Sequence, residues 1–184
     1  MIKLSCDDGC ASDMKVSELA KKYGVPCTFY WPVEMHSLAY ENSYTPLSYE
    51  DAKYIATYHN IGSHTITHRH LTKIPMAHAC YEIQESKYML QNLYNTPVND
   101  FCPPRGYTTP ELTEFTLTIY DSQRLTKGKG LVHVHPNSGA NNNKPWRECV
   151  DDETTELWFH SWELDKYNLW DELEAFLQEY SNAR

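Results

Sequence analysis

Short apolar segments alternate with amphipathic segments along this chain of 184 residues. The predicted strands are 2–6, 27–31, 61–63, 98–102, 118–125, 131–135 and 155–159. The predicted helices are 16–23, 48–58, 76–93, 111–117 and 168–180, and a long loop is expected between Pro32 and Pro46. Such alternation is typical of parallel βα units. About seven strands are too few for an eightfold barrel. We therefore expect one α/β domain over residues 1–184, folded as a small distorted or incomplete (β/α) barrel.

Polar side chains gather where these predicted strands end. They are Asp7, Asp8, His64, His68, Arg105, His135 and His160. The C-terminal ends of parallel strands meet on one face of a barrel, and the sites of barrel enzymes lie there. These residues, although far apart in the sequence, are therefore predicted to form one site.

Two of the histidines, His64 and His68, are four residues apart. On a helix or a tight helical turn, this spacing places both rings on one face, where they can chelate a divalent metal. By itself the pair also fits an ordinary helix start in a chain with nine histidines. The acidic pair Asp7 and Asp8 at the end of the first strand supplies oxygen ligands, although alone it would be read as an acidic turn.

Composition excludes several classes of protein. A net charge of −9 argues against nucleic-acid binding, which requires a basic surface. No apolar stretch approaches the roughly 18 residues of a transmembrane helix. The first residues lack the pattern of a signal peptide, and the six cysteines include no C-x-x-C pair. We therefore expect reduced thiols and a cytoplasmic protein.

Four segments resemble the motifs of the NodB-type polysaccharide deacetylases, a family of metal-dependent carbohydrate amidases and esterases. SCDDG at 5–9 is similar to the family's TFDDG, and GSHTITH at 62–68 is similar to its second motif, H-(S/T)-x-x-x-H. FCPPRGY at 101–107 is similar to the third motif, FRPPYG. LWFH at 157–160 resembles the strand that carries the final catalytic histidine. The order and spacing of the four segments also match those of the family.

The resemblance implies a distorted (β/α) barrel and a site for zinc, or a similar divalent transition metal, held by Asp8, His64 and His68. Such a site leaves a coordination position open for water and the substrate carbonyl. Asp7 would then be the general base. His160 would protonate the leaving amine, with Glu163 or Asp165 expected as the carboxylate that keeps it protonated.

Two departures from the family pattern bear on the site. The third-motif arginine, which orients the base, falls on Cys102 here. Arg105 stands three residues later and could reach back to Asp7, clamp a substrate anion or be a solvated loop residue. The usual fourth motif is not evident. His133 and His135 lie nearby instead, as substrate contacts, structural residues or a second acid; we favour a substrate contact for His135.

Aromatic residues near the predicted strand ends suit sugar binding, since their faces stack on sugar rings. We expect Trp31, Tyr107 and Trp162 in this role. Together these features predict a hydrolase that removes N-acetyl groups from a carbohydrate. The alternatives are an impaired, deacetylase-like carbohydrate-binding protein and a hydrolase of another small amide. A metal-dependent phosphodiesterase is disfavoured, because few cationic side chains lie at the predicted site to hold phosphate.

Overall fold

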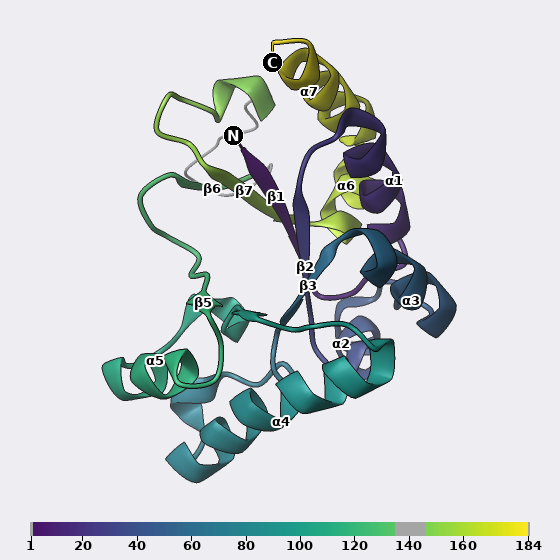
Figure 1. Cartoon of the computed structure of the whole chain (residues 1–184). Helices are drawn as coiled ribbons and strands as arrows, with labels where there is room; N and C mark the ends of the chain where they lie inside the picture. The colour runs from purple at the N-terminus through teal and green to yellow at the C-terminus, as the bar shows by residue number, and fades with distance from the viewer. Residues whose placement is uncertain (1, 135–145, 184) are drawn as a thin grey trace.

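The computed structural model describes residues 2–134 and 146–183 (Figure 1). The seven strands of this described part form one parallel sheet in the order β5-β4-β3-β2-β1-β7-β6. The strands are β1 Lys3–Asp7, β2 Cys27–Trp31, β3 Asn60–Ser63, β4 Asp100–Phe101, β5 Ser122–Gln123, β6 Leu131–His133 and β7 Glu156–His160. The sheet curls into a half-barrel, and within the described residues its two edge strands, β5 and β6, do not pair with each other to close it. The predicted incomplete barrel is confirmed.

The first and last strands, β1 and β7, lie side by side in the sheet. In the β1–β7 pairing, Asp7 lies opposite His160, and on the other side of β1 it lies opposite Tyr30 of β2. Because the pairing is parallel, the polar residues that end these strands emerge at the same edge.

The helices follow the outer side of the curled sheet in Figure 1. They are α1 Asp13–Tyr23, α2 Met35–Asn42, α3 Tyr49–Tyr58, α4 Met76–Tyr94, α5 Pro110–Leu117, α6 Ser161–Tyr167 and α7 Trp170–Asn182. The five predicted helices correspond to α1, α3, α4, α5 and α7, with ends that differ by up to three residues. Gly24 ends α1 with a left-handed φ of 65°, which a glycine adopts without steric cost.

The largest differences between the predicted elements and the structure lie in three segments. The expected loop between Pro32 and Pro46 contains α2, a short helix whose buried Met35, Leu38 and Ala39 follow helical spacing. The helix α6, directly after β7, was not predicted. The expected strand 118–125 shrinks to β5, because its first residues extend α5 as a turn: the Tyr120 amide donates to the carbonyl of Thr116 at 2.9 Å.

The core lies between the central strands and the helices. Every residue of β2 is buried, and Leu4, Phe29 and Leu157 are fully covered. Burial on both faces explains why these strands are continuously apolar rather than alternating. All six cysteines are free thiols. Among the described residues, no helix is both long and apolar enough to cross a membrane.

Candidate active site

A pocket of about 250 Å³ opens at the C-terminal ends of the strands. Its polar lining includes Asp7, Asp8, His64, His68, Arg105 and His160. Asp7 ends β1, His160 ends β7 and His64 directly follows β3, so the sheet itself brings these groups together. The convergence predicted from the strand ends is present for these six residues.

Asp8, His64 and His68 offer three potential ligand atoms to one point. Asp8 Oδ1 lies 3.5 Å from His64 Nε2 and 3.4 Å from His68 Nε2. This oxygen is buried, yet within the described part of the chain it accepts no hydrogen bond. Buried polar atoms are normally satisfied, so an oxygen left open between two imidazole nitrogens fits a bound cation. Two nitrogens and one carboxylate oxygen suit zinc or a similar divalent transition metal.

The protonation states of the two histidines agree with this role. The Nδ1 atom of His64 lies 2.6 Å from the carbonyl oxygen of Cys102, a contact that places the ring proton on Nδ1 and leaves the Nε2 lone pair facing Asp8. Burial lowers the pKa of His64 and lowers that of His68 to about 4. Both rings are therefore neutral at pH 7, the form that binds metals.

The loop that carries the two histidines is not the helical turn that their spacing predicted. Residues 64–70 are irregular, and Thr65 and His68 adopt left-handed φ values of 72° and 56°. The buried carboxylate of Glu82, on α4, holds the loop by accepting hydrogen bonds from the amides of Ile66 and Thr67, each at 2.9 Å, and from the Thr67 hydroxyl at 2.6 Å. The rings still meet, with centroids 4.8 Å apart, because tertiary contacts set the loop conformation.

Asp7 pairs with an arginine that the motif comparison did not identify. Arg124 follows β5 and donates from Nη2 to Asp7 Oδ1. Its guanidinium lies between the rings of Tyr30 and Trp158, 4.8 and 5.0 Å from their centroids. Arg105 does not reach Asp7: it is exposed and lies on the His68 side of the pocket, so that expectation is wrong. The position of Arg124 near the end of a strand could have marked it as a site residue. The strand was predicted to span 118–125, however, so Arg124 fell inside it rather than after it.

The environment keeps Asp7 ionised. Burial raises the pKa of this carboxyl, but the Arg124 guanidinium and the neighbouring histidines outweigh burial, so the pKa lies below its ordinary value. Burial likewise opposes the charge of Arg124, and the Asp7 carboxylate reverses that effect and raises the pKa of the guanidinium. Both side chains are only 4% exposed, so solvent screens this ion pair little.

His160 faces Asp8 from the side of β7. Its Nε2 lies 3.6 Å from Asp8 Oδ2, and its Nδ1 lies 3.2 Å from Glu163 Oε2. Burial disfavours the charged ring, but the Asp8 and Glu163 carboxylates outweigh burial and raise the pKa of His160 to about 9. Of the two carboxylates expected beside His160, Glu163 is the partner. Asp165 instead accepts a hydrogen bond from Trp170 Nε1 at 2.9 Å.

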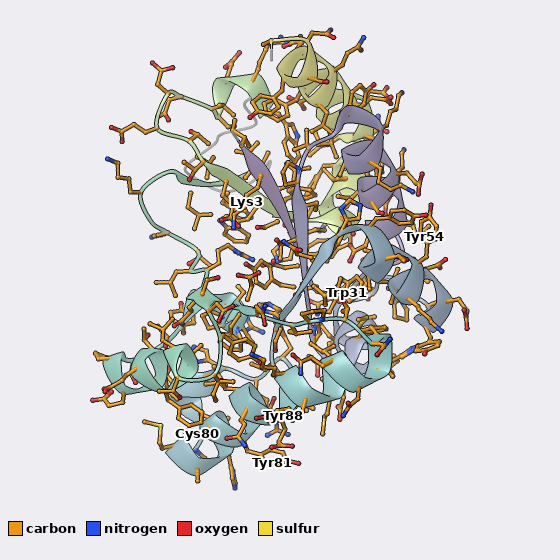
Figure 2. All side chains as sticks on the ribbon, viewed as in Figure 1. Lys3, Trp31, Tyr54, Cys80, Tyr81 and Tyr88 are labelled. Carbon is orange, nitrogen blue, oxygen red and sulfur yellow. The ribbon has the colours of Figure 1, made fainter. Side chains whose placement is uncertain are left out.

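The predicted aromatic residues occupy three different environments. Trp31, labelled in Figure 2, is fully buried in the core, and its Nε1 donates to Asp13 at 2.9 Å, so its predicted sugar contact is wrong. Trp162 lines the pocket and stacks on Tyr44, with ring centroids 6.3 Å apart. Tyr107 is 54% exposed and stacks on His70 at 4.4 Å, outside the pocket lining.

Of the two histidines near the end of β6, only His133 can be placed. Its ring stacks on Trp158, with centroids 3.6 Å apart, and lies edge-on to His160 at 6.1 Å. His135 lies outside the described residues, so its predicted substrate contact stays a prediction.

Solved structures share this fold. A mutant of a CE4 family pseudoenzyme from Bacillus anthracis superimposes with a TM-score of 0.70 and 17% identity, covering 98% of this chain and 63% of that protein. Peptidoglycan deacetylase PdaC from Bacillus subtilis gives 0.70 and 16%, with coverages of 100% and 84%. A family 4 carbohydrate esterase from Streptomyces lividans, in complex with acetate, gives 0.71 and 16%, with coverages of 98% and 88%. The chain thus spans less than two thirds of the pseudoenzyme's length.

Sequence comparison gives the family. Curated protein sequences yield no match to this chain. The family model described as polysaccharide deacetylase matches residues 1–117. This segment contains Asp7 and Asp8, His64 and His68, and the Pro-Pro-Arg turn at 103–105. More than half of the chain is covered by this match, and the structural similarity extends over the remainder. The chain belongs to the polysaccharide deacetylase family.

Proposed function

We propose that this protein is a metal-dependent hydrolase that removes N-acetyl groups from a carbohydrate. The observation that carries the proposal is the position of Asp8 Oδ1. This buried carboxylate oxygen accepts no hydrogen bond from the described residues and lies beside the Nε2 atoms of His64 and His68. An ion-paired Asp7 and a Glu163-bound His160 flank this set. Structural relatives described as peptidoglycan deacetylases support an N-acetylated sugar chain as the substrate class.

The metal would be held by Asp8 Oδ1 and the two Nε2 atoms of His64 and His68. When bound there, a divalent ion supplies a Lewis acid for the acyl oxygen and for the attacking water. The two imidazoles are already in the neutral state that binds such an ion.

Asp7 is the proposed general base. Its carboxylate is ionised at neutral pH, and Arg124 holds one of its oxygens, which fixes the orientation of the group. It also lines the pocket, where it can accept a proton from water as the water attacks the acyl carbon. Its neighbour Asp8 points to the histidines, so adjacent carboxylates take different roles.

His160 is the proposed general acid. Glu163 holds its Nδ1–H, so the Nε2–H of the charged ring points into the pocket toward Asp8. When the C–N bond of the amide breaks, this nitrogen can give its proton to the leaving amine, which would otherwise depart as an unstable anion. Acetate and a free sugar amine are the products.

Acetate release from a panel of N-acetylated sugars, oligomers and small amides, with and without added zinc, tests the proposal. We expect metal-dependent release from at least one sugar substrate. The Asp7→Asn variant should lose about 10²-fold in turnover with its metal retained, whereas the His64→Ala, His68→Ala double variant should lose the metal. Binding of oligomers without any acetate release would support the alternative of an impaired, carbohydrate-binding protein. Acetate release from non-sugar amides alone would support the alternative of a hydrolase of another small amide.

A further inference from the structure

A second hollow adjoins the catalytic pocket on the side of the His64–His70 loop. It has a volume of about 630 Å³ and shares His68 and Arg105 with the catalytic pocket. A substrate chain whose acetamido group enters the catalytic pocket, and which extends toward the His64–His70 loop, would place a neighbouring sugar in this hollow. Arg69 and Lys73 also line it, so three permanent cations surround one space next to the site.

These cations are available to a ligand. Arg69, Lys73 and Arg105 are all exposed, and none forms an ion pair with another described residue. Glu34 and Glu41 also line the hollow, but they belong to the segment around α2 and lie beyond ion-pair distance of the three cations. Its arginine, lysine and glutamate side chains give the hollow one net positive charge, three cations against two carboxylates, in a protein whose net charge is −9. This local reversal of sign favours an anionic group.

The backbone at Arg105 shows that its position is imposed. Arg105 adopts a left-handed φ of 61°, and Gly106 follows with 73°. The turn is closed by the Gly106 amide, which donates to the carbonyl of Pro103 at 2.9 Å. A left-handed conformation costs about 1–2 kcal/mol at a residue with a β-carbon, and such strain is typical of functional positions. The turn places Arg105 between the two hollows, where it lines both.

We propose that this hollow binds an anionic substituent, a carboxylate or a phosphate, on the sugar next to the one that is deacetylated. Arg105 and Lys73 are its main ligands, and the guanidinium of Arg105 suits bidentate contact with either group. This inference rests on the proposed function, because it assumes a sugar chain in the catalytic pocket. It makes the preferred substrate an acidic N-acetylated oligosaccharide rather than a neutral one.

The test compares matched oligosaccharides of equal length that are neutral, carboxylated or phosphorylated on the neighbouring sugar. The readout is the ratio of kcat/KM for the acidic and the neutral substrate, in which general damage to the enzyme cancels. We expect the Lys73→Gln, Arg105→Gln double variant to reduce this ratio about fivefold to tenfold. The Glu34→Gln, Glu41→Gln variant should increase it. The matched control is Lys53→Gln, Arg147→Gln, which removes the same charge outside the hollow and should leave the ratio unchanged.

Equilibrium binding of the same oligosaccharides to metal-free protein gives a second readout that does not depend on turnover. A preference for acidic ligands that is lost in the Lys73→Gln, Arg105→Gln variant, and that weakens with added salt, supports the subsite. The carboxylated and phosphorylated ligands show which anion it prefers. An unchanged ratio together with unchanged binding would overturn the subsite while leaving the deacetylase proposal intact. Failure of all substrates to release acetate would instead refute the deacetylase, and the binding preference would then decide the subsite alone.

Discussion

Replacing Arg124 by methionine gives the sharpest test of how the site is built. The substitution removes the guanidinium from between Tyr30 and Trp158 but keeps an unbranched apolar side chain of similar length. Asp7 then loses its hydrogen-bond donor in a site where both side chains are only 4% exposed. Arg124 Nε also lies 3.9 Å from Glu156 Oε1, but Glu156 keeps two other partners, Lys3 Nζ at 3.0 Å and the hydroxyl of Ser5, so the damage centres on Asp7.

The expected loss of stability follows from this burial. Removing one partner of a buried ion pair costs about 3–5 kcal/mol, because the remaining charge is left without compensation. No discount for solvent applies to groups this buried. A domain of this size has a total stability of about 5–15 kcal/mol, so the Arg124→Met protein should fold but with a much lower midpoint in urea. Arg147→Met is the matched control, since the pair of Arg147 with Glu179 is more than half exposed and should contribute less than about 1 kcal/mol.

The pH dependence of this loss identifies Asp7 as its cause. Because Arg124 helps hold the folded pKa of Asp7 below its ordinary value, the carboxylate stabilises the fold above the unfolded pKa. That contribution is lost as pH falls through the folded pKa. In metal-free protein, the difference between wild type and Arg124→Met should therefore be largest near pH 7 and shrink in acid. Without Arg124 the burial of Asp7 raises its pKa, so the acidic limb of the rate profile should move to higher pH and turnover at pH 7 should fall about 10²-fold.

Urea unfolding at pH 7 and pH 4, combined with a rate profile, decides the matter. A loss of stability below about 1 kcal/mol at pH 7, with no shift in the acidic limb of the rate profile, would refute the role of the ion pair in keeping Asp7 ionised. A loss that is equally large at both pH values would assign the effect to packing against the two rings instead.

Three further predictions concern residues around the site. His160→Ala should nearly abolish release of an amine while slowing an activated acetyl ester far less, because only the amine needs a proton; equal losses on both substrates would contradict an acid role. Glu82→Gln should weaken metal affinity about tenfold, because it loosens the loop that carries a proposed ligand, and cooperative unfolding should be retained. Titration with zinc and a competing chelator measures the affinity. An unchanged affinity would show that the loop around His68 keeps its conformation without Glu82. Burial raises the pKa of Asp13 to about 7 despite hydrogen bonds from Ser161 and Trp31, so its neutral form stabilises the fold below about pH 4 and this contribution is lost as pH rises through about 7. The stability of Asp13→Asn relative to wild type should therefore rise over this range in urea unfolding, and a flat difference would place the pKa of Asp13 near its ordinary value.

The sequence was sufficient for the central fold because the strongest patterns lie there. The segment 27–31 matches β2 at both ends, since a strand buried on both faces must be apolar throughout and Pro32 ends it. Weaker patterns failed where local and tertiary effects compete. The α2 segment, with three buried residues, carries too little apolar periodicity to predict a helix, and the two-residue β5 is set by its neighbour β4 rather than by its own composition.

The sequence was sufficient to predict which residues meet in the candidate site but not their local geometry. Nothing in the residue types at Thr65 and His68 indicates left-handed backbone, because the contacts of Glu82 impose the loop. Trp31 shows a different limit. An aromatic residue at a strand end has the same identity whether it contacts a ligand or fills the core, and only the position of Asp13 beneath its indole nitrogen decides between them.

The arginine that pairs with Asp7 shows that a chemical group can be present in a site although it is missing from its usual position in the sequence motif. The amide of Arg124 donates to the carbonyl of Phe101 at 2.8 Å, so the chain after β5 runs directly beside Cys102, where the family motif has its arginine. The Cys102 sulfur lies 4.0 Å from Asp7 Oδ2, while the guanidinium of Arg124 arrives at the other oxygen, Oδ1. A fixed cation within hydrogen-bond distance keeps a buried carboxylate ionised, and neighbouring strands of a parallel sheet can both supply one. The cysteine at the motif position is therefore weak support for an inactive protein, because the charge that the motif would provide reaches Asp7 from the next strand.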